Sequence, residues 1–202
     1  TGNVALGGEP CHMSTDRTGR HVLSAYYQAG HCAVHPIDEA GSVGSNATEW
    51  LETNSGAHCF QTDPSNKYAF LSHIATGSGG LPLLPPGRQE GVNAIFQYRF
   101  DAETGHLTPN DPPRVAPEPQ DGPRHFCFHP SKNLVYVSNE QGSSVTVYSL
   151  DSAAGTLMAG QTVTPLPETF TGDNSFSQIQ IRPLGNFLFV ANRGHNSIAS
   201  YA

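Results

Sequence analysis

Charged side chains are scarce in this sequence. Asp, Glu, Lys and Arg make up 13% of its 202 residues, whereas soluble domains usually contain about 25%. Acidic residues outnumber basic ones by 17 to 10, which gives a formal net charge of −7. Because nucleic-acid-binding proteins carry clustered positive charge, we expect no nucleic-acid partner.

Long apolar runs and paired cysteines are missing as well. No stretch approaches the ~20 apolar residues of a membrane-spanning helix, so we expect no membrane partner. The four cysteines, at positions 11, 32, 59 and 127, form no CxxC pair and are too few for a disulfide scaffold. We interpret them as small hydrophobic residues in a reducing compartment, and we expect a cytoplasmic protein.

Glycine (21 residues) and proline (16 residues) are plentiful, and a hairpin pattern occurs four times. Each copy has a short alternating run, a polar turn, and a second run rich in aromatic and β-branched residues. The copies span residues 10–27, 57–74, 123–140 and 177–194. Pro64, Pro130 and Pro183 hold the same place in three of the turns, where the fixed φ of proline suits the first central position.

A third strand is predicted after each hairpin, and a weaker fourth strand follows in three copies, at 41–46, 105–110 and 155–160. Residues 76–91 are predicted to be a loop because of their glycine and proline content. Repeated four-stranded units of ~40–50 residues are typical of a β-propeller. We therefore predict an all-β fold, one partial propeller domain over 1–202. Its antiparallel blades are expected at about 10–56, 57–122, 123–175 and 176–202 (incomplete), with 1–9 ending a preceding blade.

Ionisable residues gather at one end of these hairpins. The first strand of a blade lines the central channel and the second runs back antiparallel, so the first strand's start and the second strand's end share one face. Arg124, Glu140 and Arg193 lie at such ends, together with five histidines: His12, His58, His73, His125 and His195. We expect these side chains to converge at the channel mouth and to bind a small anion.

Plainer interpretations exist for the same residues. Arg124 and Glu140 could form a salt bridge that only ties the hairpin together, and His195 could brace its loop. A metal site of His12, His58 and His73 fits the ligand chemistry of imidazole, but no short spacing supports it. We therefore expect no bound metal.

The stretches "GPRH" (122–125) with "SNE" (138–140), and "NRGHNSI" (192–198), carry a family resemblance. With them, the sequence resembles the seven-bladed β-propeller lactonase family, which includes bacterial 6-phosphogluconolactonases and fungal 3-carboxy-cis,cis-muconate cyclases. The resemblance implies seven blades in the complete fold, of which about four are present here. It also implies a site without metal or cofactor whose catalytic residues match His73, Arg124, Glu140 and Arg193. His12, His58, His125 and His195 are the further candidates for substrate binding.

The expected chemistry is hydrolysis of an anionic sugar lactone such as 6-phosphoglucono-δ-lactone. Glu140 or His73 is the candidate base, while the two arginines would bind the anion and stabilise the oxyanion. Two nearby arginines favour the charged carboxylate, so Glu140 could orient a neighbour instead. The alternatives are a muconate cyclase and a non-enzymatic binding scaffold. Self-association is expected if a four-bladed chain is the natural protein.

Overall fold

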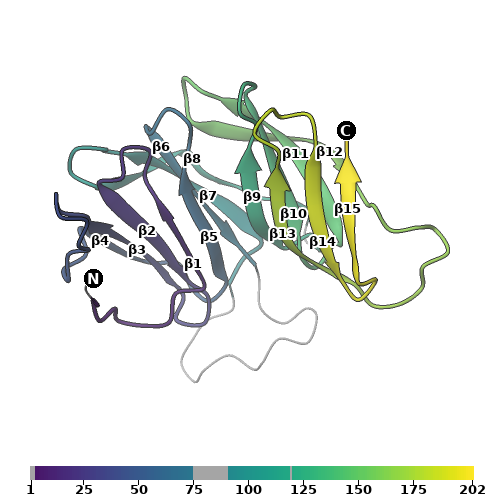
Figure 1. Ribbon diagram of the computed structural model, residues 1–202, viewed down its shortest axis with the longest axis horizontal. Helices are drawn as coiled ribbons and strands as arrows, with labels where there is room; N and C mark the ends of the chain where they lie inside the picture. The colour runs from purple at the N-terminus through teal and green to yellow at the C-terminus, as the bar shows by residue number, and fades with distance from the viewer. Residues whose placement is uncertain (1–2, 75–90, 119) are drawn as a thin grey trace.

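The computed structural model describes residues 3–74, 91–118 and 120–202, and the chain in these ranges is all-β, without a helix. Fifteen strands form four antiparallel sheets that fan out side by side (Figure 1). Blade 1 contains β1 (His12–Thr15), β2 (His21–Tyr26), β3 (His31–Pro36) and β4 (Glu49–Glu52). Blade 2 contains β5 (Ala57–Thr62), β6 (Tyr68–His73), β7 (Ala94–Phe100) and β8 (Leu107–Val115).

Blade 3 contains β9 (Pro123–Phe128), β10 (Leu134–Asn139), β11 (Ser144–Asp151) and β12 (Thr156–Val163). Blade 4 has three strands: β13 (Ser175–Ile181), β14 (Leu188–Arg193) and β15 (Ser197–Tyr201). In every sheet, neighbours along the chain are neighbours in the sheet. The predicted fold class, a propeller of antiparallel blades, is confirmed. Across the described ranges, no helix is long and apolar enough to cross a membrane.

The predicted fourth strand of blade 1 was wrong. Residues 41–46 form a turn with an isolated Ile37–Val43 bridge, and the strand is Glu49–Glu52, paired to β3. The glycine- and serine-rich segment offers little side-chain surface to pack, whereas Leu51 packs against the blade core. Residues 3–11 form no strand, so their assignment to a preceding blade stays a prediction. The loop predicted at 76–91 lies almost wholly outside the described residues.

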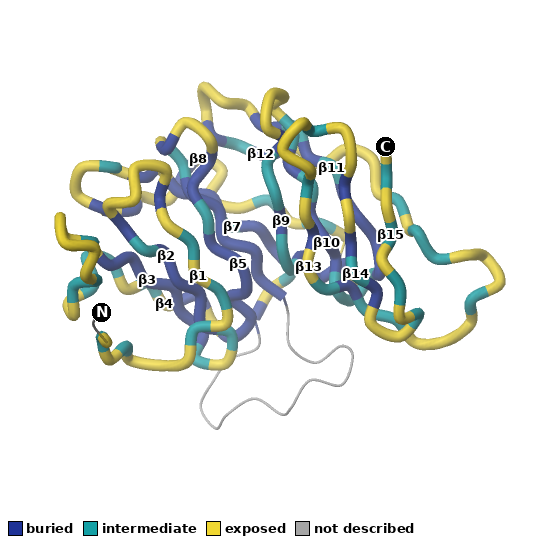
Figure 2. Tube along the Cα trace, in the orientation of Figure 1, coloured by how far each residue is buried: buried dark blue, intermediate teal, exposed yellow. Residues whose placement is uncertain are grey.

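The hydrophobic core lies between successive blades rather than in one centre. Buried side chains of blades 1 and 2 form one cluster, blades 2 and 3 a second, and blades 3 and 4 a third. Strands β5 and β7 of blade 2, which lies between two of these clusters, are therefore buried along most of their length (Figure 2). The outward faces of blades 1 and 4 have no neighbouring blade in this chain and carry exposed apolar side chains. Met13 of blade 1 is 60% exposed and Ile198 of blade 4 is 73% exposed.

The first hairpin turns of neighbouring blades lie together at one end of the molecule. The Arg17 amide in the blade 1 turn donates to Asn66 Oδ1 in the blade 2 turn, at 2.9 Å, and Asn66 Nδ2 donates to Asp16 at 2.8 Å. The inner strands β1, β5, β9 and β13 consequently all begin at the opposite end (Figure 1). This opposite end, which we call the mouth, is where the ionisable residues were predicted to converge.

Candidate active site

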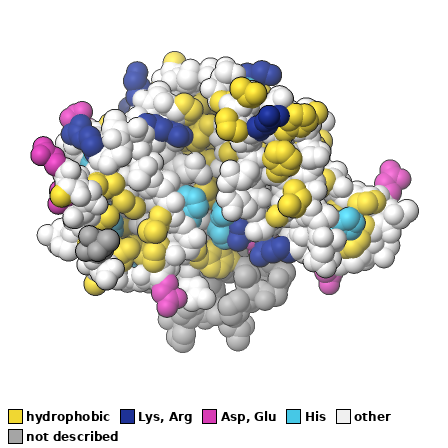
Figure 3. Space-filling model, viewed as in Figure 1, with side chains coloured by type: hydrophobic (Ala, Val, Ile, Leu, Met, Phe, Trp, Pro, Cys, Tyr) yellow, Lys and Arg dark blue, Asp and Glu magenta, His cyan; other side chains and the backbone are white. Residues whose placement is uncertain are grey.

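A cavity of about 730 Å³ opens at the mouth between blade 1 and blades 3 and 4. Histidine and arginine side chains gather in this hollow (Figure 3). The lining residues are Glu9, Pro10, Cys11, Tyr27, Gln28, Ala29, His58, Arg124, Glu140 and Arg193. Three of the four residues predicted to be catalytic therefore line one cavity.

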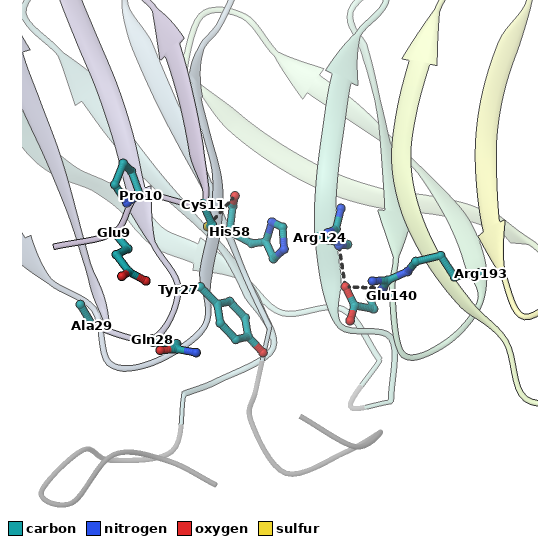
Figure 4. Close-up of a pocket in the computed structure, with 10 residues that line it drawn as sticks. All are labelled: Glu9, Pro10, Cys11, Tyr27, Gln28, Ala29, His58, Arg124, Glu140 and Arg193. Carbon is teal, nitrogen blue, oxygen red and sulfur yellow. Dashed lines mark hydrogen bonds and ion pairs between the residues drawn. The ribbon is translucent and has the colours of Figure 1, made fainter. Parts of the chain in front are cut away.

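Two arginines share one carboxylate oxygen on the cavity wall. Glu140 Oε2 accepts from Arg124 Nε at 2.5 Å and lies 3.0 Å from an Arg193 terminal nitrogen (Figure 4). The Arg124 and Glu140 side chains are 15% and 14% exposed, whereas Arg193 is 46% exposed. Charge-assisted pairs of this kind are among the stronger hydrogen bonds in proteins. Arg193 therefore presents the accessible positive charge, and Arg124 is the buried anchor.

Backbone contacts fix this group between three blades. The Arg124 carbonyl accepts from Ser72 Oγ of blade 2. The Glu140 amide donates to Gly122 at 2.8 Å, and its carbonyl accepts from the Phe176 amide of blade 4 at 3.2 Å. Because Glu140 follows β10 and Arg124 lies at the start of β9, the antiparallel pairing of these strands sets the two side chains side by side.

A second group at the mouth consists of His12, His58 and His125, one from the start of each of three inner strands. The His125 ring lies 5.5 Å from His12 and 5.0 Å from His58, both edge to face. His12 Nδ1 accepts from the Phe60 amide at 3.3 Å. Arg124 lies 3.4 Å from His125 Nε2, and because the guanidinium can only donate, that nitrogen accepts.

These three imidazoles are neutral near pH 7. Burial first, and then the Arg124 charge, lower the pKa of His12 to about 4 and of His58 to about 2. The same causes, with His12 and Arg193 adding to them, lower the pKa of His125 to about 3. The mouth thus has a charged part, formed by the two arginines and Glu140, and a neutral polar part formed by the histidines.

His73 does not join the arginines in the cavity. It ends β6 and is fully buried, with Nδ1 3.1 Å from the Val92 carbonyl and Nε2 3.0 Å from the Asn54 carbonyl. Gly56 and Gly91 make room for its ring, since a Cβ on either would lie within 3.0 Å of it. The expected convergence fails for this residue because its side chain points into the blade packing. A catalytic role for His73 stays a prediction.

His195 also lies outside the cavity lining. Its amide donates to Asn174 Oδ1 at 3.0 Å, its Nδ1 lies 2.7 Å from Ser197 Oγ, and its ring packs on Phe170 at 4.9 Å. These contacts fit the plainer interpretation, in which His195 braces the loop before β15. Its predicted role in substrate binding stays a prediction.

The sequence analysis missed Tyr27, Cys11 and Glu9, which line the cavity. Tyr27 directly follows β2, and its ring lies 5.6 Å from His58. Its position after a second strand was the available signal, because the same rule selected Glu140. Burial, with the Glu140 charge as the next cause, raises the pKa of Tyr27 to about 12, so its hydroxyl keeps its proton at neutral pH.

The described residues include no group of three or more His, Cys, Asp or Glu side chains that could hold a metal ion. The alternative site of His12, His58 and His73 does not form, because the ring nitrogens of His73 face backbone carbonyls. All four cysteines have free thiols.

Comparison with known proteins assigns the family. The family model described as "Lactonase, 7-bladed beta-propeller" matches residues 1–78 and 88–202. The chain belongs to this lactonase family. Two relatives named 6-phosphogluconolactonase, from Bacillus subtilis (strain 168) and Pectobacterium atrosepticum, are each 33% identical, over 96% and 95% of this chain. The same alignments span 53% and 52% of those proteins, so the chain spans about half the length of the relatives that it matches.

A solved lactonase structure has the same blade arrangement. The periplasmic gluconolactonase PpgL of Pseudomonas aeruginosa is similar to this chain with a TM-score of 0.82 and 25% sequence identity. The match covers 98% of this chain and 54% of PpgL. Both kinds of comparison therefore relate the four blades to proteins that are named for the hydrolysis of sugar lactones.

Proposed function

We propose that this protein hydrolyses an anionic sugar lactone, as the relatives named 6-phosphogluconolactonase do. The observation that carries the proposal is the Arg124–Glu140–Arg193 group on the wall of a cavity of about 730 Å³, in a chain of the lactonase family. This volume is in the range usual for small-molecule sites.

The arginines would act in two ways. Arg193 is half-exposed and would hold the phosphate or carboxylate of the substrate, for which the planar guanidinium gives paired hydrogen bonds. Arg124 is mostly buried, at 15% exposure, and a positive charge shielded from water stabilises a developing oxyanion more strongly than an exposed one. Water attacks the lactone carbonyl and gives up a proton, and the tetrahedral oxyanion forms beside Arg124. The ring C–O bond then breaks, and the leaving oxygen takes up a proton to become the hydroxyl of the product acid.

Glu140 would have two roles in this reaction: it would orient the two arginines, and it would act as the general base. One of its oxygens already accepts from both arginines, which fixes the guanidinium groups relative to each other. An arriving anion competes with Glu140 for Arg193, and this competition would free the carboxylate to take a proton from water. We infer that Glu140 orients the arginines in the resting site and serves as the base once substrate is bound.

A cytoplasmic location fits this function, and the four free cysteines suit a reducing compartment. Because the solved relative PpgL is named periplasmic, cell fractionation with cytoplasmic and periplasmic marker enzymes is the direct test.

The activity is tested on the full-length protein with a panel of lactones, followed by pH-stat above the spontaneous rate. The panel contains 6-phosphoglucono-δ-lactone, glucono-δ-lactone and unsubstituted δ-valerolactone, each with and without a chelator, and Arg124→Ala serves as the matched control. We expect the phosphorylated lactone to be opened fastest and the chelator to have no effect.

Three results would contradict parts of this proposal. Turnover of 3-carboxy-cis,cis-muconate in place of lactones would make the protein a cyclase. Binding of ligands without turnover of any of them would make it a binding scaffold. Loss of activity on chelation, restored by a divalent metal, would overturn the metal-free reaction.

A further inference from the structure

Two residues of the cavity lining each carry a buried polar atom that has no hydrogen-bond partner within the described chain. Among the described residues, neither the Tyr27 hydroxyl nor His58 Nδ1 has one. His58 is only 9% exposed. Leaving a buried donor or acceptor unpaired destabilises a protein, and unpaired groups in native structures therefore call for an explanation. Here both atoms belong to residues that line the same cavity.

These two side chains face the arginine group across the cavity. Tyr27 follows β2 of blade 1 and His58 lies at the start of β5 in blade 2, whereas Arg124 belongs to blade 3 (Figure 4). The Tyr27 and His58 rings meet edge to face at 5.6 Å. Within the part of the chain that the structure describes, neither atom forms a hydrogen bond, so a small rotation of each ring towards a ligand breaks no contact of that kind there.

Tyr27 and His58 are both uncharged at neutral pH, and this favours an uncharged polar group of a ligand as their hydrogen-bond partner. The tyrosine hydroxyl keeps its proton at neutral pH because burial raises its pKa to about 12. His58 is uncharged there because burial and Arg124 lower its pKa to about 2, so its ring offers one donor and one acceptor. A second carboxylate or phosphate would find no positive charge on this wall, whereas a hydroxyl group can both donate to and accept from it.

We propose that Tyr27 and His58 form a hydroxyl-binding subsite that makes the cavity selective for polyhydroxylated acids and their lactones over ligands of equal charge without hydroxyls. The anion sits at the arginines, and the hydroxylated carbons reach the Tyr27–His58 wall. The binding of lactones rests on the proposed hydrolase function, whereas the preference for hydroxylated acids is independent of it.

The test is the binding of a matched pair of ligands to the full-length protein by isothermal titration calorimetry. D-Glucarate and adipate are both six-carbon dicarboxylates, and only glucarate carries hydroxyl groups. Tyr27→Phe removes one hydroxyl, and His58→Phe removes both ring nitrogens while keeping the ring. Tyr148→Phe is the control, because its buried hydroxyl also lacks a partner but lies in the core between blades 2 and 3, away from the cavity lining.

We expect the wild type to bind glucarate more tightly than adipate. Tyr27→Phe and His58→Phe should each weaken glucarate binding by about 3- to 10-fold, the value of one neutral hydrogen bond, and leave adipate binding unchanged. Tyr148→Phe should change neither. Equal binding of the two ligands by the wild type, or equal losses for both ligands in the variants, would overturn the subsite.

The outcome separates the subsite from the proposed reaction. A protein that prefers glucarate through Tyr27 but opens no lactone keeps the subsite and rejects the hydrolase. A protein that opens δ-valerolactone as fast as glucono-δ-lactone keeps a hydrolase and rejects the subsite. If the protein binds neither glucarate nor adipate, both the subsite and the binding of the anion by the arginines are overturned.

Discussion

Asp63 and His58 lie at opposite ends of the same inner strand, β5, and both are buried polar side chains, at 1% and 9% exposure. Asp63 accepts hydrogen bonds from the amides of Ser65, Lys67 and Tyr68 at 2.9, 3.0 and 2.9 Å. His58 Nδ1, at the mouth, has no partner among the described residues. The carboxylate that follows β5 is thus paired with the amides of its turn, whereas the imidazole at the start of β5 keeps one nitrogen unpaired within the described residues.

Similar side-chain caps stabilise the first hairpin turns of blades 1 and 3. In blade 1, Asp16 accepts from the Arg20 and His21 amides at 2.7 and 2.9 Å, and in blade 3 His129 Nδ1 accepts from the Ser131 and Lys132 amides at 3.1 and 3.0 Å. Side chains that cap turns in this way stabilise the local backbone. The end of the molecule that carries these hairpin turns, which we call the turn end, is therefore stabilised by side-chain caps, whereas His58 Nδ1 beside the cavity stays unpaired within the described residues.

The largest effect on activity is expected from Glu140→Gln at the mouth. Gln has nearly the same shape, but it leaves Arg124 and Arg193 without the negative charge that they share. If Glu140 is the base, kcat should fall by about 100-fold or more, as is typical of lost acid–base catalysis, with little change in the melting temperature. Steady-state kinetics and calorimetry on the same preparation check this. Normal turnover in a protein that melts early would make Glu140 a purely structural partner of Arg124.

Arg193→Ala and Arg124→Ala should differ from each other. Charge-assisted hydrogen bonds contribute roughly 1.5–3 kcal/mol, so loss of either arginine should lower kcat/KM by about 10- to 150-fold. Arg193 is half-exposed and Arg124 is mostly buried, so only Arg124→Ala should also lower stability. Lys at position 193 should restore part of the activity, because it keeps the charge but lacks the planar fork. Wild-type kinetics in either Ala variant would remove that arginine from the site.

At the turn end, Asp63→Ala should affect stability alone. It removes a buried carboxylate that caps the blade 2 turn, and the loss of a cap costs up to about 2 kcal/mol, which corresponds to roughly 4–8 °C in melting temperature for a domain of this size. The kinetic constants should stay at wild-type values. Asp151→Ala is the matched control, because Asp151 also caps a turn, through the Ala153 and Ala154 amides, but is exposed. An equal loss in both variants would show that burial of Asp63 contributes nothing.

The turn end was largely predictable from sequence, because its chemistry is local. Polar turn residues with proline at a fixed place identify the hairpins, and hairpin spacing identifies the blades. The convergence of Arg124, Glu140 and Arg193 followed from topology, since strand ends on one face must meet. What sequence could not give was the direction of individual side chains. His73 pairs with Ala57 at the end of β6 and turns into the core, whereas His58, one residue further along β5, lines the cavity.

Tyr26 and Tyr27 illustrate the same limit. Tyr26 is fully buried, whereas Tyr27 lines the cavity. From the sequence alone, both residues are placed in the same predicted strand. A single step along a strand reverses the face to which a side chain points. The exact end of β2 therefore decides which tyrosine reaches the mouth, and strand ends are the least predictable part of an element.

The smallest expected effect is on the pH dependence of stability, to which His58 at the mouth and Asp16 at the turn end should contribute in different pH ranges. The pKa values of His12, His58 and His125 are lowered from about 6.5 to about 4, 2 and 3. Below pH 6.5 the unfolded chain therefore binds protons that the folded mouth does not, so the free energy of unfolding falls as the pH drops towards 4. At the turn end, burial alone would raise the pKa of Asp16, but hydrogen bonds from Thr18, Asn66 and the His21 amide together outweigh it and lower the pKa from 3.8 to about 2. Its contribution to stability is present above pH 3.8 and is lost only below that value.

His58→Phe should accordingly flatten the dependence of stability on pH between 6.5 and 4, by up to about 1.4 kcal/mol per pH unit for the one proton removed. Asp16→Asn should leave the slope in that window unchanged and reduce the dependence below pH 3.8. Urea unfolding at a series of pH values measures both slopes, and only the change of slope matters, because either substitution can shift the overall stability. If the His58→Phe slope between pH 6.5 and 4 equals that of the wild type, then His58 titrates alike in the folded and unfolded chains. The mouth would then lack an imidazole that burial and the Arg124 charge keep neutral.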